Sequence, residues 1–423
     1  MSLAVALAST WALFLSLGLL MLGHGLQGTL LGLRAGIEGF SPATVGVVMT
    51  GYFGGYLIGS QLAPVLIRRV GHIRVFAALA AIGACVILLH PLAVDAAAWT
   101  ALRVVTGICF AGLYLVVESW LNDAVTNETR GRLLSVYMVV MTGGLGAGQL
   151  LLNVADPAGL ELFVVVALLI TLSLVPVALV VVRAPTFASP SPVSWRRLYR
   201  SSPLGVVGAV MTGTAHSAIF GLAPTYGQQI GLDIEQVSLM MAGNFAGGML
   251  LQWPIGWLSD RFDRRTVLTG TAALGAVAAL GVLAAGSHPL AVVGAVSLLG
   301  GASLPLYSLC IAHTNDHLRR EEIVAAGGTI VLLVGLGMSL GPSLAGSVMS
   351  LAGPAGLFWW QALAHGGIVA FALYRMTRRP ALAAAVQGSP TAVSPRTTAL
   401  ATAIAMRMVR DHRDRDIARL GRR

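Results

Sequence analysis

The chain consists largely of apolar stretches that are each long enough to cross a lipid bilayer as a helix. A transmembrane helix needs about 20 mostly apolar residues, and twelve such stretches follow one another, separated by short loops that carry Arg, Pro, Asp or Gly. They cover roughly residues 10–33, 44–67, 75–91, 99–121, 133–153 and 161–182, and then 204–226, 237–258, 266–286, 290–312, 325–350 and 356–376. This pattern predicts an all-α membrane protein with twelve transmembrane helices.

The composition excludes several other classes of protein. Only 10% of the residues are charged and 56% are hydrophobic, whereas a soluble domain carries about 25% charged residues. So few charges cannot cover the surface of a soluble protein of this length, which sets aside a soluble enzyme, a nucleic-acid-binding protein and a disordered chain. The three cysteines, Cys85, Cys109 and Cys310, lie inside apolar runs without a spacing motif, so we expect neither a disulfide framework nor a metal site.

The distribution of arginine predicts how the chain crosses the membrane. All 27 basic residues are Arg, and with both termini inside only Arg34 and Arg103 lie toward the outer side. Positive residues gather in cytoplasmic loops. Residues 1–33 contain no basic residue at all, so we interpret the first apolar stretch as a transmembrane helix rather than a signal peptide. We therefore expect an integral protein of the bacterial plasma (inner) membrane with both termini in the cytoplasm.

The two halves of the sequence resemble each other at an offset of 192 to 193 residues. Residues 51–57 align with residues 243–249, His24 with His216, and Tyr114 with Tyr307. Spans that match in this way run in the same direction, which indicates two parallel repeats with a solute site between them. We predict an N-terminal six-helix bundle over residues 1–182, a cytoplasmic linker over 183–203, a C-terminal six-helix bundle over 204–376, and a basic, largely disordered cytoplasmic tail over 377–423.

Three motifs resemble those of the major facilitator superfamily, and the resemblance covers roughly residues 10–376. The loop after the eighth span reads Gly256-Trp257-Leu258-Ser259-Asp260-Arg261-Phe262-Asp263-Arg264-Arg265, which matches the superfamily's loop signature except that Asp263 replaces a Gly. The first-half copy is degenerate, with Pro64 in place of a Gly and Arg68 in place of the Asp. Arg103 and Gly107 match the fourth-span signature. The resemblance implies two pseudo-symmetric six-helix bundles and transport by alternating access.

Ionisable and polar residues within the spans are the candidates for solute binding, because such groups are costly inside a membrane. The resemblance implies that spans one, four, seven and ten line the cavity. The predicted lining residues are His24, Gln27, Tyr52, Arg103, Tyr114, His216, Tyr226, Asn244 and Tyr307. A guanidinium offers a planar fork to a carboxylate or phosphate. For each of these residues, hydrogen bonding between packed helices is an alternative role.

Proton coupling and gating each have their own candidates. The predicted proton carriers are Glu118, Arg103, His24 and His216; Glu118 is alternatively a helix-end carboxylate paired with a loop Arg. The predicted gating residues are Arg68, Arg69, Arg130, Arg132, Asp260, Arg261, Glu321 and Glu322. Pseudo-symmetry brings Arg68 and Arg69 toward the two glutamates, and Asp260 toward Arg130 and Arg132, so these pairs are expected to close the cytoplasmic side. Positive-inside arginines with incidental acids, or pairing within one half, are the alternatives.

These observations favour a secondary active transporter that moves a small organic solute and is coupled to protons. Arg103 and the two histidines favour an anionic or zwitterionic solute. Two alternatives remain at this stage. One is multidrug efflux by proton antiport, although the fifth span lacks the antiporter signature's Gly-Pro, which occurs instead at Gly341-Pro342. The other is a non-transporting sensor or assembly protein that kept the fold. We expect no enzymatic activity, no cofactor and no nucleic acid, and a monomer whose partners are the solute, protons and membrane lipid.

Overall fold

A computed structural model of the chain describes residues 3–124, 130–179 and 193–378, together with Thr398 and Thr402. In the first half the elements are α1 (Leu3–Ile37), α2 (Pro42–Val70), α3 (His72–Leu89), α4 (Ala96–Ala124), α5 (Arg130–Leu150), the 3-10 turn η1 (Leu151–Val154), α6 (Glu161–Leu172) and α7 (Leu174–Leu179). The second half contains α8 (Trp195–Ser201), α9 (Pro203–Gln229), α10 (Ile234–Arg261), α11 (Arg264–Ala285), α12 (Pro289–Asn315), α13 (Arg320–Ala352) and α14 (Gly356–Arg378).

The predicted spans correspond to these helices, with two differences. The sixth span is interrupted at Ser173 between α6 and α7, where Pro176 lies in the next turn and has no N–H to donate to a preceding carbonyl. The linker contains a short helix, α8, that the Pro/Ser/Arg-rich sequence did not predict. Ten of the described helices are long and apolar enough to cross a membrane; the two long helices outside that set, α2 and α10, occupy equivalent places in the two halves.

Each half is held together by the same close helix crossing. In the first half α2 packs on α4, and a Cβ atom built on Gly55 would overlap the carbonyl oxygen of Val104. In the second half α10 packs on α12, and a Cβ on Gly247 would overlap the carbonyl oxygen of Ser297. Because only glycine lets two helix backbones approach this closely, the sequence repeat encodes a repeated contact.

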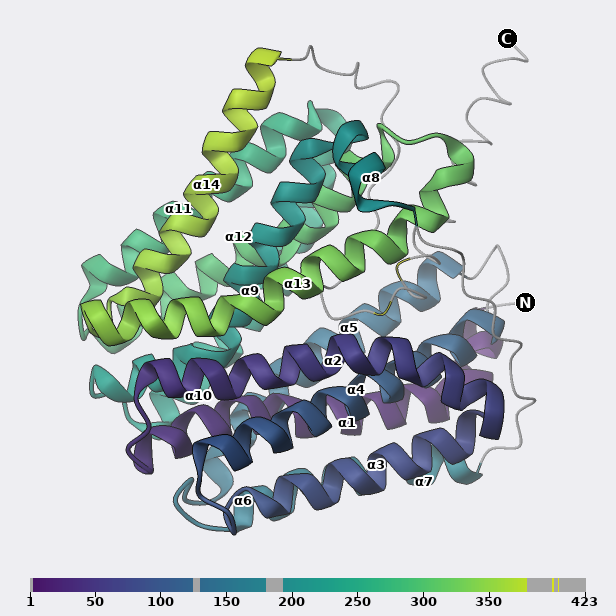
Figure 1. The fold of residues 1–423 in the computed structure, drawn as a ribbon, viewed down its shortest axis with the longest axis vertical. Helices are drawn as coiled ribbons and strands as arrows, with labels where there is room; N and C mark the ends of the chain where they lie inside the picture. The colour runs from purple at the N-terminus through teal and green to yellow at the C-terminus, as the bar shows by residue number, and fades with distance from the viewer. Residues whose placement is uncertain (1–2, 125–129, 180–192, 379–397, 399–401, 403–423) are drawn as a thin grey trace.

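The two halves touch each other mainly at one side of the molecule. We call the side where α1 begins and α14 ends the terminal side, and the opposite side the distal side. On the distal side, the Thr50 and Ser343 hydroxyls lie 2.8 Å apart, the Asn153 amide donates to Ser238 Oγ at 2.9 Å, and Thr225 donates to the Gly32 carbonyl at 3.1 Å. In Figure 1 the halves lie closest at the left and diverge toward the right.

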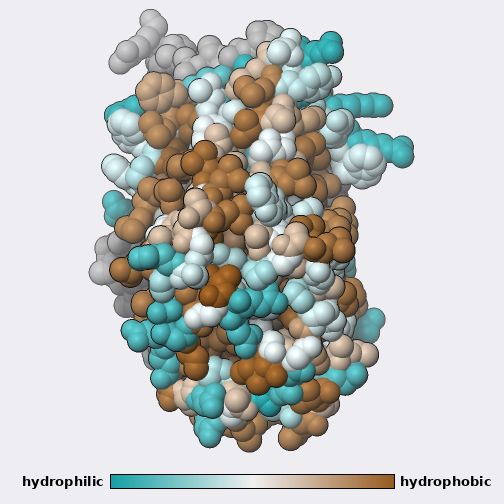
Figure 2. All heavy atoms as spheres, turned by 90° about the vertical axis from the view of Figure 1, so that its left-hand side faces the viewer, coloured by the Kyte–Doolittle hydropathy of each residue, from teal (hydrophilic) through white to brown (hydrophobic). Residues whose placement is uncertain are grey.

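The outer surface suits a hydrocarbon solvent. Seen from the left of Figure 1, hydrophobic side chains reach the surface over much of the upper part, whereas hydrophilic ones gather in patches lower down (Figure 2). Large apolar residues that are well exposed include Trp11, Leu168, Leu250, Trp253, Val277, Leu351 and Leu363. Apolar surface of this extent on a folded chain marks contact with lipid.

Candidate functional site

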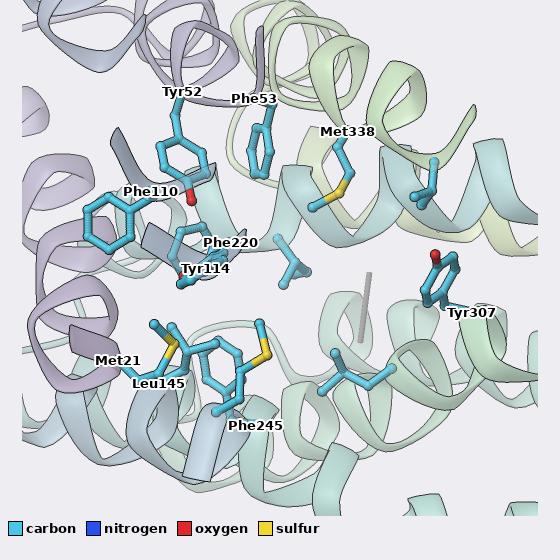
Figure 3. Packing of buried hydrophobic residues seen from close by; sticks show 14 of the residues in the cluster. Met21, Tyr52, Phe53, Phe110, Tyr114, Leu145, Phe220, Phe245, Tyr307 and Met338 are labelled. Carbon is cyan, nitrogen blue, oxygen red and sulfur yellow. The ribbon is translucent and has the colours of Figure 1, made fainter. Parts of the chain in front are cut away.

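An aromatic cluster surrounds His24 in the middle of the molecule. The His24 ring is buried on α1, and its centroid lies 5.1 Å from that of Tyr52, 4.4 Å from that of Phe110 and 5.7 Å from that of Phe220. Tyr114 meets the same ring edge-on at 6.4 Å. These rings come from α1, α2 and α4 of the first half and α9 of the second. Figure 3 shows four of them, Tyr52, Phe110, Tyr114 and Phe220, close together. The cluster therefore joins the two halves around one ionisable group.

Arg103 extends this cluster with a buried cation. Its side chain is fully buried on α4, and its guanidinium carbon lies 4.6 Å from the centroid of the Tyr52 ring. The attraction between a cation and the face of an aromatic ring is stronger where water is excluded. Arg103 thus contacts the same tyrosine as His24, and the structure brings His24, Tyr52, Arg103 and Tyr114 together. That these residues bind a solute stays a prediction.

Gln27 lies one turn from His24 on α1 and is also fully buried. Neither atom of its side-chain amide has a hydrogen-bond partner among the described residues. A buried polar group without a hydrogen-bond partner destabilises the folded protein unless another molecule supplies that partner. The amide is therefore well placed to bind a polar solute.

Glu118 lies four residues beyond Tyr114 on α4 and is fully buried. Its carboxylate accepts a hydrogen bond from the Tyr137 hydroxyl of α5 at 2.6 Å. It also accepts from the Thr398 backbone N–H, at 3.2 Å to each oxygen, and from the Thr398 hydroxyl. The sequence predicted a loop Arg as the alternative partner; the donors that the structure places on Glu118 are hydroxyl and amide groups.

The remaining predicted lining residues lie in the second half. His216 is buried on α9, one turn before Phe220 and thus on the same face of that helix. Tyr307 on α12 is buried near Glu118, and Thr402 lies beside its hydroxyl. The other two contact neighbouring helices: the Tyr226 ring lies 4.6 Å from that of Phe358 of α14 between centroids, and the Asn244 backbone packs against Gly300. Their predicted place in the solute site stays a prediction.

The predicted gating residues lie on the terminal side and are mostly exposed. Arg68, Arg69, Arg132 and Asp260 are exposed, and Arg261 stacks on Trp257 at 3.8 Å. Glu322 forms an ion pair with Arg197 of α8 and accepts a hydrogen bond from the Arg319 N–H. The side chains of Arg130 and Glu321 lie outside the described residues. In the conformation described, Glu322 is thus engaged by the linker helix, and the latch between halves stays a prediction for a conformation closed on the terminal side.

Two sets of interacting residues were not predicted from the sequence. One is the set of neutral hydroxyl and amide contacts that join the halves on the distal side, for which the sequence offers no charge signal. The other is a buried ion pair between Arg264 and Asp316 at 2.6 Å, with side chains 1% and 4% exposed. Arg264 belongs to the loop signature, and Asp316 belongs to the pair Asn315-Asp316, which repeats Asn122-Asp123 of the first half. The sequence did not predict that Arg264 and Asp316 meet.

His90, a buried histidine on the distal side, makes the stability of the folded protein depend on pH. It lies in the turn after α3, where its Nδ1–H donates to the Val86 carbonyl at 3.0 Å and its carbonyl accepts from the Trp99 indole at 2.9 Å. Burial, reinforced by the nearby Arg103 guanidinium, lowers the pKa of His90 to about 4. Since the unfolded chain binds the proton below about pH 6.5 and the folded chain does not until about pH 4, stability is complete above pH 6.5 and falls as the pH drops.

We therefore expect acidification from pH 7 to pH 4.5 to lower the apparent melting temperature in detergent, with His90 contributing up to about 3 kcal/mol. His90→Gln should flatten this part of the pH profile. His288→Gln is the matched control, because His288 precedes α12 as His90 precedes α4 but is exposed. A pH profile that is unchanged in the His90 variant would contradict the assignment.

Comparison with known proteins places this architecture in a family. The sequence profile described as the Major Facilitator Superfamily matches residues 4–235 and 205–413. The chain belongs to the major facilitator superfamily. It is 30% identical over 333 residues to an uncharacterized MFS-type transporter, YcaD, of Escherichia fergusonii, covering 78% of this chain and 86% of that protein. An Escherichia coli YcaD is 32% identical over 337 residues, with the same two coverages.

Solved structures of two other transporters share the fold. The nucleoside transporter NupG superposes with a TM-score of 0.71 at 14% identity, covering 89% of this chain and 99% of that one. A bacterial homologue of the human lysosomal transporter Spinster, in an inward-facing and occupied conformation, gives a TM-score of 0.66 at 14% identity, covering 87% and 94%. The chain is thus an integral membrane transporter of the superfamily, with the predicted twelve helices in two bundles.

Proposed function

We propose that this transporter moves a small polar organic solute across the bacterial inner membrane by alternating access, coupled to protons. The observation that carries the proposal is the buried cluster of His24, Arg103 and Tyr52, which packs on Phe220 of the opposite half. Groups of this kind are expensive inside a membrane and mark solute or proton pathways. Their position between the two halves is where a repeat transporter binds its solute.

The conformation corresponds to one of the two states of an alternating-access cycle. The halves touch through α1 with α9, α2 with α13 and α5 with α10, and the hydrogen bonds across this contact lie on the distal side. With the termini in the cytoplasm, as the arginine distribution predicts, this is a state closed to the outside. The charged residues on the terminal side would then close the cytoplasmic face in the opposite state.

The polar groups favour a solute that carries both signs of charge or both donors and acceptors. Arg103 offers a cation and Gln27 an amide in the distal part of the cluster, whereas Glu118 offers an acceptor nearer the terminal side. The test is uptake into proteoliposomes from a panel of amino acids, nucleosides, sugars and organic acids, with lipophilic cations included. The panel includes nucleosides because NupG, which has a similar fold, is named a nucleoside transporter. Flux of lipophilic cations alone would favour multidrug efflux, and no flux at all would favour a non-transporting role.

Proton coupling yields a prediction at Glu118. Glu118→Gln removes the titratable group and keeps one hydrogen-bond acceptor, so accumulation driven by a pH gradient should fall at least about tenfold, and it should fall by more than the exchange of labelled for unlabelled solute falls. Glu161→Gln, at the exposed start of α6, is the matched control and should behave like the wild type. Gradient-driven accumulation that survives in Glu118→Gln moves the coupling role to His24 or His216, whose Asn variants are then measured in the same way.

A further inference from the structure

Two residues of the C-terminal tail are buried inside the molecule. Thr398 and Thr402 lie beyond Arg378, where α14 ends, yet their exposed fractions are 4% and 0%. The Thr402 N–H donates to the Thr398 carbonyl at 3.1 Å, which is the hydrogen bond of one helical turn. Both threonines therefore lie between the helices rather than on the surface.

The contacts of Thr398 with Glu118 have a specific chemical form. The backbone nitrogen of Thr398 lies 3.2 Å from both Glu118 oxygens, and its hydroxyl donates to the same carboxylate. The two donors sit on adjacent carbons, Cα and Cβ. One carboxylate therefore receives a pair of donors of the kind found in a 1,2-amino alcohol or a vicinal diol, while Tyr137 supplies the third hydrogen bond at 2.6 Å.

The two threonines together contact both halves of the transporter. Thr398 contacts Glu118 on α4 of the first half, and Thr402 lies beside Tyr307 on α12 of the second. Tyr114 precedes Glu118 by one turn, and it aligns with Tyr307 in the sequence repeat. A transported solute must likewise contact both halves, because their relative movement is what carries it across.

We propose that Glu118 is a specificity-determining residue for solutes that present two hydrogen-bond donors on adjacent carbons, and that Thr398 occupies this subsite as a tethered competitor. The proposal rests on the transport function proposed above. A carboxylate that accepts two donors at once favours solutes whose donors sit on adjacent carbons, since donors that are further apart must fix an additional rotatable bond to reach it together. The tail would lower the apparent affinity for the solute by competing for the same acceptor.

The occupancy of the subsite can be measured without knowing the solute. In the full-length wild-type chain in lipid nanodiscs, hydrogen–deuterium exchange should find the tail segment that contains Thr398 protected. Thr398→Val removes the hydroxyl but keeps the shape of the side chain, so exchange of that segment should become about tenfold faster. Thr377→Val is the matched control, because Thr377 is exposed at the end of α14 and donates to the Tyr374 carbonyl. A segment that is unprotected in the wild type would overturn the proposal.

The spacing of the donors is tested with two isomeric probes. In 1-amino-2-propanol the amine and hydroxyl sit on adjacent carbons, whereas in 3-amino-1-propanol a further carbon separates them. At equal concentration, the first should displace Thr398 and speed exchange of the tail segment more than the second does. Equal effects from both isomers, or no effect from either, would overturn the donor-pair rule. Because this readout needs no flux, a chain that binds the first isomer but transports nothing would refute the proposed transport function and leave the subsite intact.

Discussion

Replacing Arg103 by lysine should reduce transport at least about tenfold while leaving the protein in the membrane. The guanidinium of Arg103 is fully buried and stacks on the Tyr52 ring at 4.6 Å. An ammonium is compact and more strongly hydrated, and it has no planar face to lie on the ring or fork to hold a solute. The positive charge is kept in this variant, so the loss would report on geometry rather than on charge alone.

The measurement is the initial rate of uptake in proteoliposomes, normalised to the amount of reconstituted protein. Arg74→Lys is the matched control, because Arg74 is exposed on α3, and its rate should stay within about twofold of the wild type. Tyr52→Phe should retain more activity than Tyr52→Leu, since only the first keeps a ring beneath the cation. A normal rate in Arg103→Lys would show that Arg103 holds helices together and does not bind solute.

The twelve helices were predictable because each helix must form its own backbone hydrogen bonds inside the bilayer. Every backbone polar group in lipid needs a partner within the helix, so apolar length alone identifies a span, and the repeat fixes which spans are equivalent. The break at Ser173 and the helix Trp195–Ser201 were not predicted. Both depend on local backbone geometry in segments whose composition is compatible with either a helix or a loop.

The site was predictable only where one helix face determines it. Arg103, Tyr114 and Glu118 share a stripe on α4, and all three are buried there. Partners from other elements could not be read in the same way. Charge complementarity suggested Glu322 as a partner for Arg68 and Arg69, but a chain with 27 arginines offers many candidates, and the structure pairs Glu322 with Arg197.

Gly55 to alanine should destabilise the first bundle strongly, although the change adds only one methyl group. A Cβ at this position would overlap the carbonyl oxygen of Val104 and lie close to its carbonyl carbon. Both are backbone atoms, so α2 and α4 would have to move apart along their crossing. Overpacking of this kind costs typically about 1–3 kcal/mol and sometimes more, which should appear as a lower apparent melting temperature and a lower abundance in the membrane.

Gly54 provides the matched control at the adjacent position, since a Cβ there meets no atom within 4 Å. Alanine also stabilises a helix by up to about 1 kcal/mol relative to glycine, so Gly54→Ala should leave stability unchanged or slightly raised. The repeat extends the test to the second half, where Gly247→Ala would overlap the Ser297 carbonyl and Gly256→Ala would meet no atom within 4 Å. If the two variants of each pair melt at the same temperature, the glycines do not set the distance between these helices, and the sequence repeat has another cause.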